Sequence, residues 1–310
     1  MSLDADSVVD RRRLKRRLGV WRLVGIAAIV AVLVLGFNRL GVSPGVLERD
    51  YVARLVVEGI IAEDLDRDEA LARIAEDRRA KALVVRINSP GGTVVGGEAL
   101  YRQLRLMSEV KPVVAVMGEV ATSAAYLAAL GTDHIIARQG TVTGSIGVLL
   151  QTANITGLLD SIGIETELVK SAPLKAQPNP LEDLSPEARE AIEQVVQDMF
   201  AMFVAIVQER REFTREQALD VADGRVFTGR QAIENGLIDA IGSEIDARAW
   251  LAEVHDVDPG LAVREIDEEG AAVWVRRQIA AIFGKGLFSE ILRLDGLVSL
   301  WHLQARSATN

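Results

Sequence analysis

The sequence predicts an α/β protein with a largely parallel sheet, and two observations support this prediction. Short apolar runs rich in β-branched residues recur between residues 51 and 169, and they are apolar at consecutive rather than alternate positions. Stretches with apolar side chains at helical spacing separate these runs. Strands that are apolar on both faces belong to sheets that helices cover on both sides. We therefore expect β-α units that build a mainly parallel sheet.

Strands and helices are expected to alternate along the chain. The expected strands are YVARLVVEGIIA (51–62), ALVVRIN (82–88), PVVAVMG (112–118), HIIAR (134–138) and TELV (166–169). The expected helices between them are DEALARIAEDRR (68–79), GEALYRQLRLMSEV (97–110) and SAAYLAAL (123–130).

A longer helix is expected to begin at Ser185, which can cap it, with Pro186 at the first helical position. One apolar face follows at helical spacing, formed by Ile192, Val195, Val196, Met199, Phe200, Phe203 and Val207. Capping-box patterns at Thr214 (TREQ) and Thr228 (TGRQ) predict two further helix starts.

The N-terminal region has the pattern of a membrane anchor. A basic cluster at residues 11–17 precedes an apolar stretch at 18–36 that just reaches the length of about 20 residues needed to cross a bilayer. A cleaved signal peptide and a buried core helix remain as alternatives. The positive-inside rule would keep the N-terminus cytoplasmic and place the rest in the periplasm or outside the cell.

Five parts are therefore expected along the chain, which is anchored in a bacterial inner membrane by a single pass. They are a basic cytoplasmic tail (1–17), a transmembrane signal anchor (18–37), a linker (38–50), a folded domain (51–250) and an amphipathic C-terminal extension (251–310).

Composition and motif absences exclude several functions. The net charge of −9 argues against a nucleic-acid partner, and the absence of cysteine removes thiolate metal sites and a cysteine nucleophile. No HExxH, GxxxxGK[ST] or strand-borne GxGxxG motif is present, so we expect no metal and no cofactor. The acidic run at 63–69 has Glu69 where a calcium loop needs glycine, which favours a solvated turn before a helix.

Ser123, in GEVATSAAYL, lies where a strand is expected to give way to a helix, so it could cap the helix or act as a nucleophile. A serine nucleophile needs a base. His134 falls in an expected buried strand, and His255 and His302 lie in no recognisable motif. One strand earlier, INSPGG (87–92) is either a plain turn or a loop that directs backbone amides at an oxyanion.

Lysine is the other candidate base, and the chain has only Lys15, Lys81, Lys111, Lys170, Lys175 and Lys285. The first lies on the cytoplasmic side and the next two at strand entrances, which leaves Lys170, Lys175 and Lys285. A lysine base must be neutral, so its pKa must fall from about 10.4 towards 7 to 8 through burial. Lys175 follows Pro173 and Leu174 in an irregular segment that could lie over a crevice, although a solvated surface charge is the plain alternative.

Five motifs in this order resemble the bacterial signal peptide peptidases of the serine-lysine type, peptidase family S49. They are RINSPGG (86–92), GEVATSAAYLAA (118–129), TGSIGV (143–148), VKSAPLK (169–175) and GRVFTGRQAIENGLIDAIG (224–242), and the likeness covers residues 52–250. The resemblance implies the Clp-protease/crotonase fold, with repeated β-β-α units and a mainly parallel sheet.

The resemblance also implies the site residues. Ser123 would be the nucleophile, Lys175 the general base and Ser145 the residue that orients the lysine. The amides of Gly92 and Ala124 would form the oxyanion hole. Two departures from the family pattern are alanines after the nucleophile, which could narrow the site, and Ala172 in place of glycine after Lys170-Ser171.

The activity implied is that of a membrane-anchored serine endopeptidase that degrades signal peptide remnants and other small-residue-rich hydrophobic peptides through an acyl-enzyme. Single-copy chains of this family form rings in which neighbouring protomers share the dyad, and we expect such a ring, an octamer, here. Two other functions stay open: a crotonase-like acyl-thioester enzyme with Glu119 as its carboxylate, and a catalytically silent membrane scaffold.

Overall fold

The structure is a computed structural model that describes residues 21, 22, 25 and 49–266. The chain divides into two compact units, residues 1–49 and 50–310. Most of the expected tail, anchor and linker, and the part of the expected C-terminal extension after residue 266, therefore lie outside the described residues. Within the described part, no helix has both the length and the apolar character needed to cross a bilayer.

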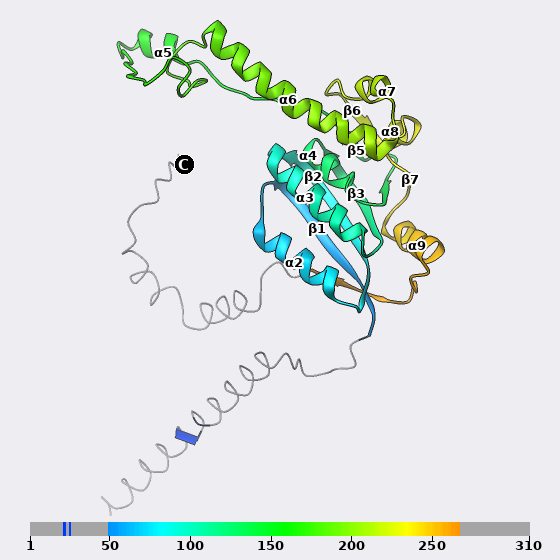
Figure 1. The fold of residues 1–310 in the computed structure, drawn as a ribbon. Helices are drawn as coiled ribbons and strands as arrows, with labels where there is room; N and C mark the ends of the chain where they lie inside the picture. The colour runs from blue at the N-terminus through cyan, green and yellow to red at the C-terminus, as the bar shows by residue number, and fades with distance from the viewer. Residues whose placement is uncertain (1–20, 23–24, 26–48, 267–310) are drawn as a thin grey trace, which may run out of the picture. The chain divides into compact units, whose positions relative to one another are not determined.

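The second unit is built on a sheet in the order β6-β5-β3-β2-β1-β8, with β4 attached to β3 and β7 to β4 (Figure 1). The strands are β1 (Tyr51–Ile61), β2 (Ala80–Gly92), β3 (Val113–Thr122), β4 (His134–Ala137), β5 (Val142–Gly144), β6 (Val226–Thr228), β7 (Ala240–Ile241) and β8 (Ala262–Glu265). Every pairing between the described strands is parallel except that of β5 with β6. The predicted α/β class with a mainly parallel sheet is confirmed.

Two expectations about the strands are wrong. TELV (166–169) is not a strand, because no strand lies beside it in the described part of the chain and Val169 is 94% exposed. The described elements also alternate as β-α units through α4 (Ala124–Ala129) rather than as repeated β-β-α units. After α4, β4 and β5 follow each other directly, and they pair with opposite ends of β3.

The other described helices are α2 (Leu65–Glu76), α3 (Val94–Ser108), α5 (Thr156–Ser161), α6 (Pro186–Arg211), α7 (Arg215–Asp220), α8 (Gly229–Glu234) and α9 (Glu244–His255). Ser185 caps α6 by accepting a hydrogen bond from the Ala188 amide, and capping boxes begin α7 and α8, as predicted. Helix α3 begins three residues earlier than expected, because Thr93 caps it by accepting from the Gly96 amide at 3.0 Å.

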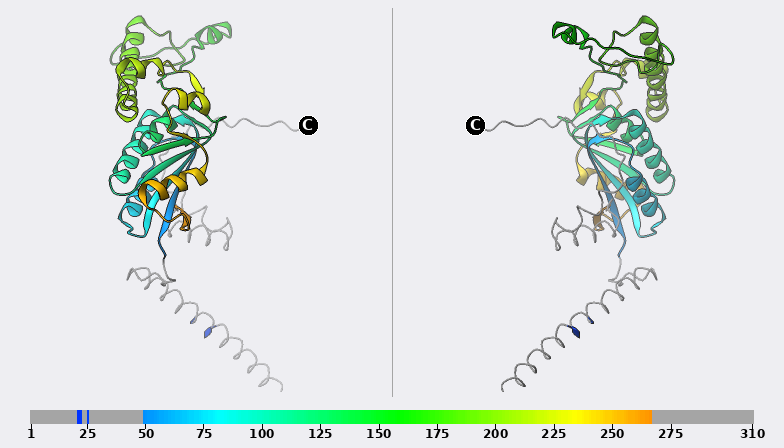
Figure 2. Two further views of the ribbon diagram at one scale, coloured as in Figure 1. Left: turned by 90° about the vertical axis from the view of Figure 1, so that its right-hand side faces the viewer. Right: turned by 90° about the vertical axis from the view of Figure 1, so that its left-hand side faces the viewer.

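Alternate residues of the central strands enter two separate cores. On one face, Leu55, Leu83 and Val85 pack with side chains of α2, α3, α4 and α6. On the other face, Val52 and Val84 pack with residues of α9, which covers that side of the sheet (Figure 2). The sheet is therefore a middle layer, as its doubly apolar strands require. Helix α9 spans residue 250 and β8 pairs with β1, so the fold continues beyond the expected boundary at 250.

Residues 149–202, which we call the arm, project away from this body (Figure 1). The arm holds α5, the irregular segment that follows it and the N-terminal part of α6. Ala188 is its one buried residue. The C-terminal part of α6 packs into the main core through Phe203, Val204 and Val207. The apolar face predicted for α6 is thus buried along only part of the helix.

Candidate active site

A cavity of about 640 Å³ lies where β1, β2, β3 and β5 end. It is lined by Ile60, Pro90, Gly91, Gly92, Thr93, Val94, Ser123, Ser145, Gly147, Val148, Leu149 and Gly224. Parallel sheets commonly place their sites at the carboxyl ends of the strands. Three of the predicted site residues, Gly92, Ser123 and Ser145, therefore meet at one cavity.

Ser123 forms the sharp turn between β3 and α4. Its backbone has φ 55° and ψ −123°, a region that a residue with a Cβ atom rarely occupies. Such strain persists only where surrounding bonds impose it, and it is common at functional sites. Here the Ser123 amide donates to the Gly144 carbonyl at 2.8 Å, and the Ser123 carbonyl accepts from the Leu127 amide at 2.9 Å.

The Ser123 hydroxyl makes no capping hydrogen bond to α4, so the structure removes the capping alternative. The side chain is partly exposed and borders the cavity. A serine held on a strained strand-to-helix turn is the arrangement by which several hydrolases present a nucleophile. The local geometry thus suits attack on a bound group rather than helix termination.

The two adjacent glycines of INSPGG lie against the Ser123 turn and β1. A Cβ atom on Gly91, whose φ is 111°, would lie 3.0 Å from both the Ser123 Cβ and the Thr122 carbonyl oxygen. A Cβ atom on Gly92 would lie 1.9 Å from the Ile61 carbonyl oxygen. Both positions therefore require glycine, and the loop is more than a plain turn.

The Gly91 amide is already bonded within this loop, because it donates to the Ser89 hydroxyl oxygen at 3.0 Å. The Ser89 hydroxyl in turn donates to the Gly59 carbonyl at 2.6 Å. The Gly92 amide is the other glycine amide of the loop and the oxyanion donor that the sequence predicts. The Ala124 nitrogen lies 3.2 Å from where a Cβ atom of Gly91 would be, so both predicted donors flank the same glycine.

The alanine after the nucleophile does not narrow the site, contrary to expectation. Ala124 is 4% exposed, and its methyl group faces α3, where a Cβ atom on Gly97 would lie only 2.8 Å away. The extra methyl group therefore packs between two helices instead of entering the cavity.

Ser145 follows β5 directly and also has a strained backbone, with φ 52°. Its amide donates to the Arg225 carbonyl at 2.8 Å. Within the described residues, neither the Ser145 hydroxyl nor the Ser123 hydroxyl has a hydrogen-bond partner in the chain. Both are therefore free to bond to a ligand or to a side chain from outside.

Three polar side chains that sequence reasoning missed bond the strand ends to one another: the buried hydroxyls of Thr122 and Thr143 and the half-buried side-chain amide of Asn88. Thr122 Oγ1 donates to the Pro90 carbonyl at 2.9 Å, and Thr143 Oγ1 donates to the Ala121 carbonyl at 2.7 Å. Asn88 Oδ1 accepts from the amides of Glu119 and Val120. In the sequence, these residues stand out only as polar residues at the ends of apolar strand runs. Polar residues at such positions ordinarily indicate a surface turn, so the pattern does not reveal these hydrogen bonds.

Lys175 is the predicted site residue that the single chain does not bring to the cavity. It is exposed, lies in the arm between α5 and α6, and is not among the cavity-lining residues. Its ammonium group has no partner in the described part of the protein. Lys170, by contrast, is paired with Glu182 and partly buried, and this hydrogen bond lowers the pKa of Glu182.

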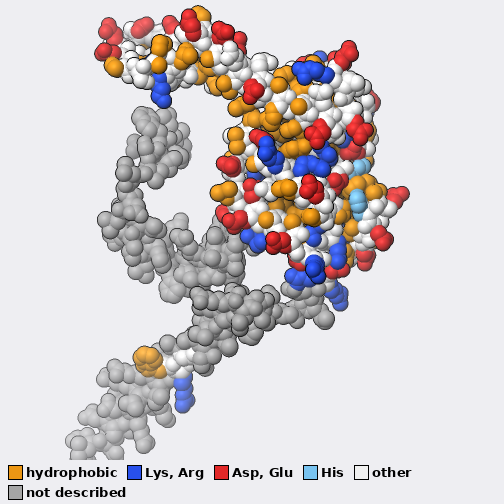
Figure 3. Space-filling view, viewed as in Figure 1, with side chains coloured by type: hydrophobic (Ala, Val, Ile, Leu, Met, Phe, Trp, Pro, Cys, Tyr) orange, Lys and Arg blue, Asp and Glu red, His pale blue; other side chains and the backbone are white. Residues whose placement is uncertain are grey.

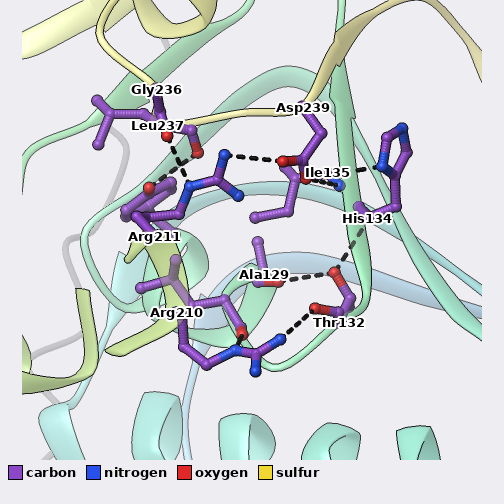
Figure 4. Close-up of polar contacts among 11 residues, drawn as sticks. Ala129, Thr132, His134, Ile135, Arg210, Arg211, Gly236, Leu237 and Asp239 are labelled. Atoms are coloured by element: carbon purple, nitrogen blue, oxygen red, sulfur yellow. Dashed lines mark hydrogen bonds and ion pairs between the residues drawn. The ribbon is translucent and has the colours of Figure 1, made fainter. Parts of the chain in front are cut away.

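His134 lies in a structural network away from the cavity, as expected (Figure 4). Its Nδ1 is 3.8 Å from Asp239 Oδ2, and its ring stacks on Trp250 at 4.6 Å. Burial lowers the pKa of His134. Asp239 also accepts from Arg211 at 2.8 Å and from the Ile135 amide at 2.7 Å.

The remaining candidates of the sequence lie elsewhere. His255 packs edge-on against Trp250, and His302 and Lys285 fall outside the described residues. Asp64 of the acidic run caps α2 by accepting from the Arg67 amide, as a turn before a helix should. Glu119 is exposed and does not line the cavity, which leaves the acyl-thioester alternative without its carboxylate. No group of three or more His, Asp or Glu side chains in the described part could hold a metal ion.

Fold and site together define a serine hydrolase of the α/β type, with a strained serine at the end of a central parallel strand and the glycine pair of INSPGG beside it. The model of "Peptidase family S49" matches residues 105–258, and that of "Clp protease" matches residues 60–140. The fold is accordingly of the Clp-protease/crotonase type.

Two curated relatives extend this comparison. "Putative protease slr0021" of Synechocystis is 39% identical over 212 residues, which cover 68% of this chain and 76% of the relative. "Putative signal peptide peptidase SppA" of Enterococcus faecium is 31% identical, with 74% of this chain and 71% of the relative covered. The chain belongs to peptidase family S49 and is a serine protease.

One solved structure is also similar. It is a lysine-to-alanine mutant of the 1510-N membrane-bound stomatin-specific protease in complex with a substrate peptide. That chain is 16% identical to this one, with 76% of this chain and 100% of the other covered and a TM-score of 0.47.

Proposed function

We propose that this protein is an endopeptidase in which Ser123 is the nucleophile and Lys175 of a neighbouring protomer is the general base. The observation that carries the proposal is the strained Ser123 turn, which presents a free hydroxyl to a cavity beside the glycine pair of INSPGG. A serine hydroxyl is a weak nucleophile until a base removes its proton. Neither histidine of the described residues borders this cavity, so a lysine from outside is the base that the site lacks.

The proposed reaction proceeds through an acyl-enzyme. The neutral amine of Lys175 takes the proton of Ser123, whose oxygen attacks the carbonyl carbon of the peptide bond. The amides of Gly92 and Ala124 hold the resulting oxyanion. The lysine then protonates the departing amine, and the acyl-enzyme forms. Water, activated by the same lysine, hydrolyses the ester and restores the serine. Ser145 would accept a hydrogen bond from the lysine and orient it.

Assembly supplies what the single chain lacks. A neutral lysine requires burial, yet Lys175 is exposed on the arm. The arm also exposes apolar side chains, among them Leu149 at 80% and Val195 at 51% (Figure 3). Exposed apolar surface of this kind marks an interaction site. A ring, for which we propose an octamer, would cover the arm and carry its lysine to the next protomer's serine.

The proposed substrates are hydrophobic peptides rich in small residues, including signal peptide remnants left in the membrane. The cavity wall offers apolar contacts from Ile60, Val94, Val148 and Leu149, with glycines between them. The basic and apolar N-terminal segment would anchor the enzyme in the inner membrane with the peptidase domain outside the cytoplasm. The tether would then raise the enzyme concentration near such substrates.

Trans-complementation tests both the dyad and its sharing. The full chain in detergent is assayed on a fluorogenic Ala- and Leu-rich peptide, and Ser123→Ala and Lys175→Ala are each expected to abolish cleavage. When the two variants are mixed under subunit exchange, about one quarter of the sites of a head-to-tail ring should regain both groups. No recovery would indicate a dyad within one chain, and full activity of either single variant would refute the assignment.

A further inference from the structure

The motif that begins at Gly224 contributes a turn to the cavity that Ser123 borders. Gly224 lines the cavity and has φ 85°. The next residue, Arg225, accepts the Ser145 amide on its carbonyl oxygen at 2.8 Å. Because the φ of Ser145 is 52°, this bond is one of the constraints that hold Ser145 in a conformation it would otherwise leave.

Ser123 is held by the two short paired strands β5 and β6, which lie next to this turn. Strand β5 ends at Gly144, whose carbonyl accepts the Ser123 amide at 2.8 Å. Gly144 pairs with Val226 of β6, and a Cβ atom on Gly144 would lie 2.7 Å from the ring of Phe227. Ser123 is therefore bonded to the last residue of β5, and Ser145 to the residue just before β6. The turn before β6 thus lies at the end of the strand pair where both serines are held.

Asp223 fixes the turn itself. Its Oδ1 accepts from the Arg225 amide at 3.1 Å and from Arg225 Nε at 2.8 Å. A carboxylate that accepts the amide two residues ahead restrains the backbone into a tight turn. This restraint sets where the Arg225 carbonyl points, and therefore where Ser145 is held.

We propose that Asp223 is a positioning residue for catalysis, which acts by fixing the Arg225 carbonyl that holds Ser145 towards the cavity. The inference rests on the proposed function, since Ser145 can orient a base only if Lys175 reaches the site. Asp223 touches neither substrate nor the reacting atoms in this account. Its effect passes through two backbone groups and one serine.

The proposed effect of Asp223 does not depend on its exposed ion pair with the Arg225 side chain. The side chains of Arg225 and Asp223 are 63% and 43% exposed, and ion pairs in such positions add little to stability. The variants should therefore fold. The bond that matters is the one to the Arg225 amide, which the amide oxygen of an asparagine can also accept.

The test compares Asp223→Ala with Asp223→Asn in the full-length protein. The matched control is Glu69→Ala, which also removes an exposed carboxylate from a pair with arginine, here Arg73 on α2. The measurements are kcat and KM on the fluorogenic peptide, the rate at which a fluorophosphonate labels Ser123, and the melting temperature.

Asp223→Ala is expected to lower kcat and the labelling rate by about tenfold to a hundredfold, the range that a small misplacement of a catalytic group produces. The KM and the melting temperature should stay near those of the parent protein. Asp223→Asn should restore most of the activity, and Glu69→Ala should leave it unchanged.

Three outcomes would overturn the inference: unchanged kcat in Asp223→Ala, an equal loss in Asp223→Asn, or a loss of kcat that follows a fall in melting temperature. Ser123→Ala and Lys175→Ala are measured beside these variants. If either stays active, the proposed dyad fails. If both are inactive while Asp223→Ala is normal, only the positioning role of Asp223 fails.

Discussion

At the scale of single residues, the site depends on backbone conformations that side chains rarely permit. Ser123 and Ser145 both have positive φ angles. The Ser123 amide donates a hydrogen bond to a carbonyl at the end of β5, and the Ser145 amide donates one to a carbonyl just before β6. Gly91 makes room for Ser123. The orientation of the Ser123 side chain therefore depends on a few close contacts around it, including those with Gly91.

Gly91→Ala is expected to lower kcat by about tenfold or more, because the new methyl group would push against the Ser123 Cβ and the Thr122 carbonyl. The positive φ of 111° adds a stability cost of about 1 to 3 kcal/mol. Steady-state kinetics and urea denaturation measure the two effects. Gly140→Ala is the control, since a Cβ atom there meets nothing within 4 Å. Equal effects of the two substitutions would show that contact with Ser123 is not the cause.

At the scale of elements, two consecutive arginines fasten the end of α6 to the body (Figure 4). Arg210 donates to the carbonyls of Leu130 and Thr132, just after α4, the helix that Ser123 precedes. Arg211 donates to the Gly236 carbonyl and to Asp239, which also lies beside His134. The C-terminal end of α6 is thus hydrogen-bonded to the segment that follows α4 and to Asp239, the carboxylate beside His134.

This network predicts a pH dependence of stability. Burial lowers the pKa of His134, Asp239 opposes that shift, and Arg211 adds to it. Because the unfolded chain then binds the proton more readily, the free energy of unfolding should fall as the pH drops below about 6.5, the ordinary pKa of histidine, and level off below the folded-state pKa. The loss of unfolding free energy is complete below the folded-state pKa of His134 and absent well above the ordinary pKa of histidine.

Urea denaturation of the parent and His134→Gln proteins between about pH 8 and pH 5 measures this dependence. The difference between the two curves isolates His134 from the carboxylates, which titrate in both proteins. A difference that is independent of pH would contradict the predicted protonation behaviour.

At the scale of the whole molecule, the arm is unusual because its apolar residues find no core. Its groove of about 570 Å³ is lined partly by Leu149, Leu150, Ile192 and Val196. The body is packed on both faces of its sheet. The described part of the chain therefore forms a packed fold, but it does not bring to Ser123 the lysine that the proposed enzyme needs.

Val195→Glu is expected to block assembly, because a charge placed in a covered apolar contact loses its hydration. Sedimentation velocity should show smaller species with unchanged circular dichroism, and peptide cleavage should fall with them. Ile245→Glu is the matched control, since Ile245 is 80% exposed on α9, outside the arm. Assembly that survives Val195→Glu, or that fails equally in the control, would remove the arm from the interface.

Much of this architecture could be predicted from the sequence, and the exceptions have physical causes. The strands β1 to β4 were predictable because burial on both faces leaves continuous apolar runs, and the cap of α6 because Ser185 and Pro186 mark its start. TELV has the same composition as a strand but no partner within the described chain. Apolar residues that have a partner only in an assembly look the same in sequence as those of a core.

The sequence could indicate which residues form the candidate site, but not how they are arranged. The motif order singled out Ser123, Ser145 and Gly92, which meet at the cavity. The bonds that strain the two serines come from distant partners, such as the Arg225 carbonyl for Ser145, and no local pattern encodes them. The position of Lys175 relative to Ser123 likewise depends on a neighbouring chain in our account.

The most direct test of the central claim is the site of covalent modification by a serine-directed fluorophosphonate. Mass spectrometry of the digested full-length protein should place the adduct on the peptide that contains Ser123. The adduct should be lost in Lys175→Ala and retained in Lys81→Ala, which removes an exposed lysine paired with Asp50. An adduct on another serine, or labelling of Ser123 at the parent rate without Lys175, would contradict the account.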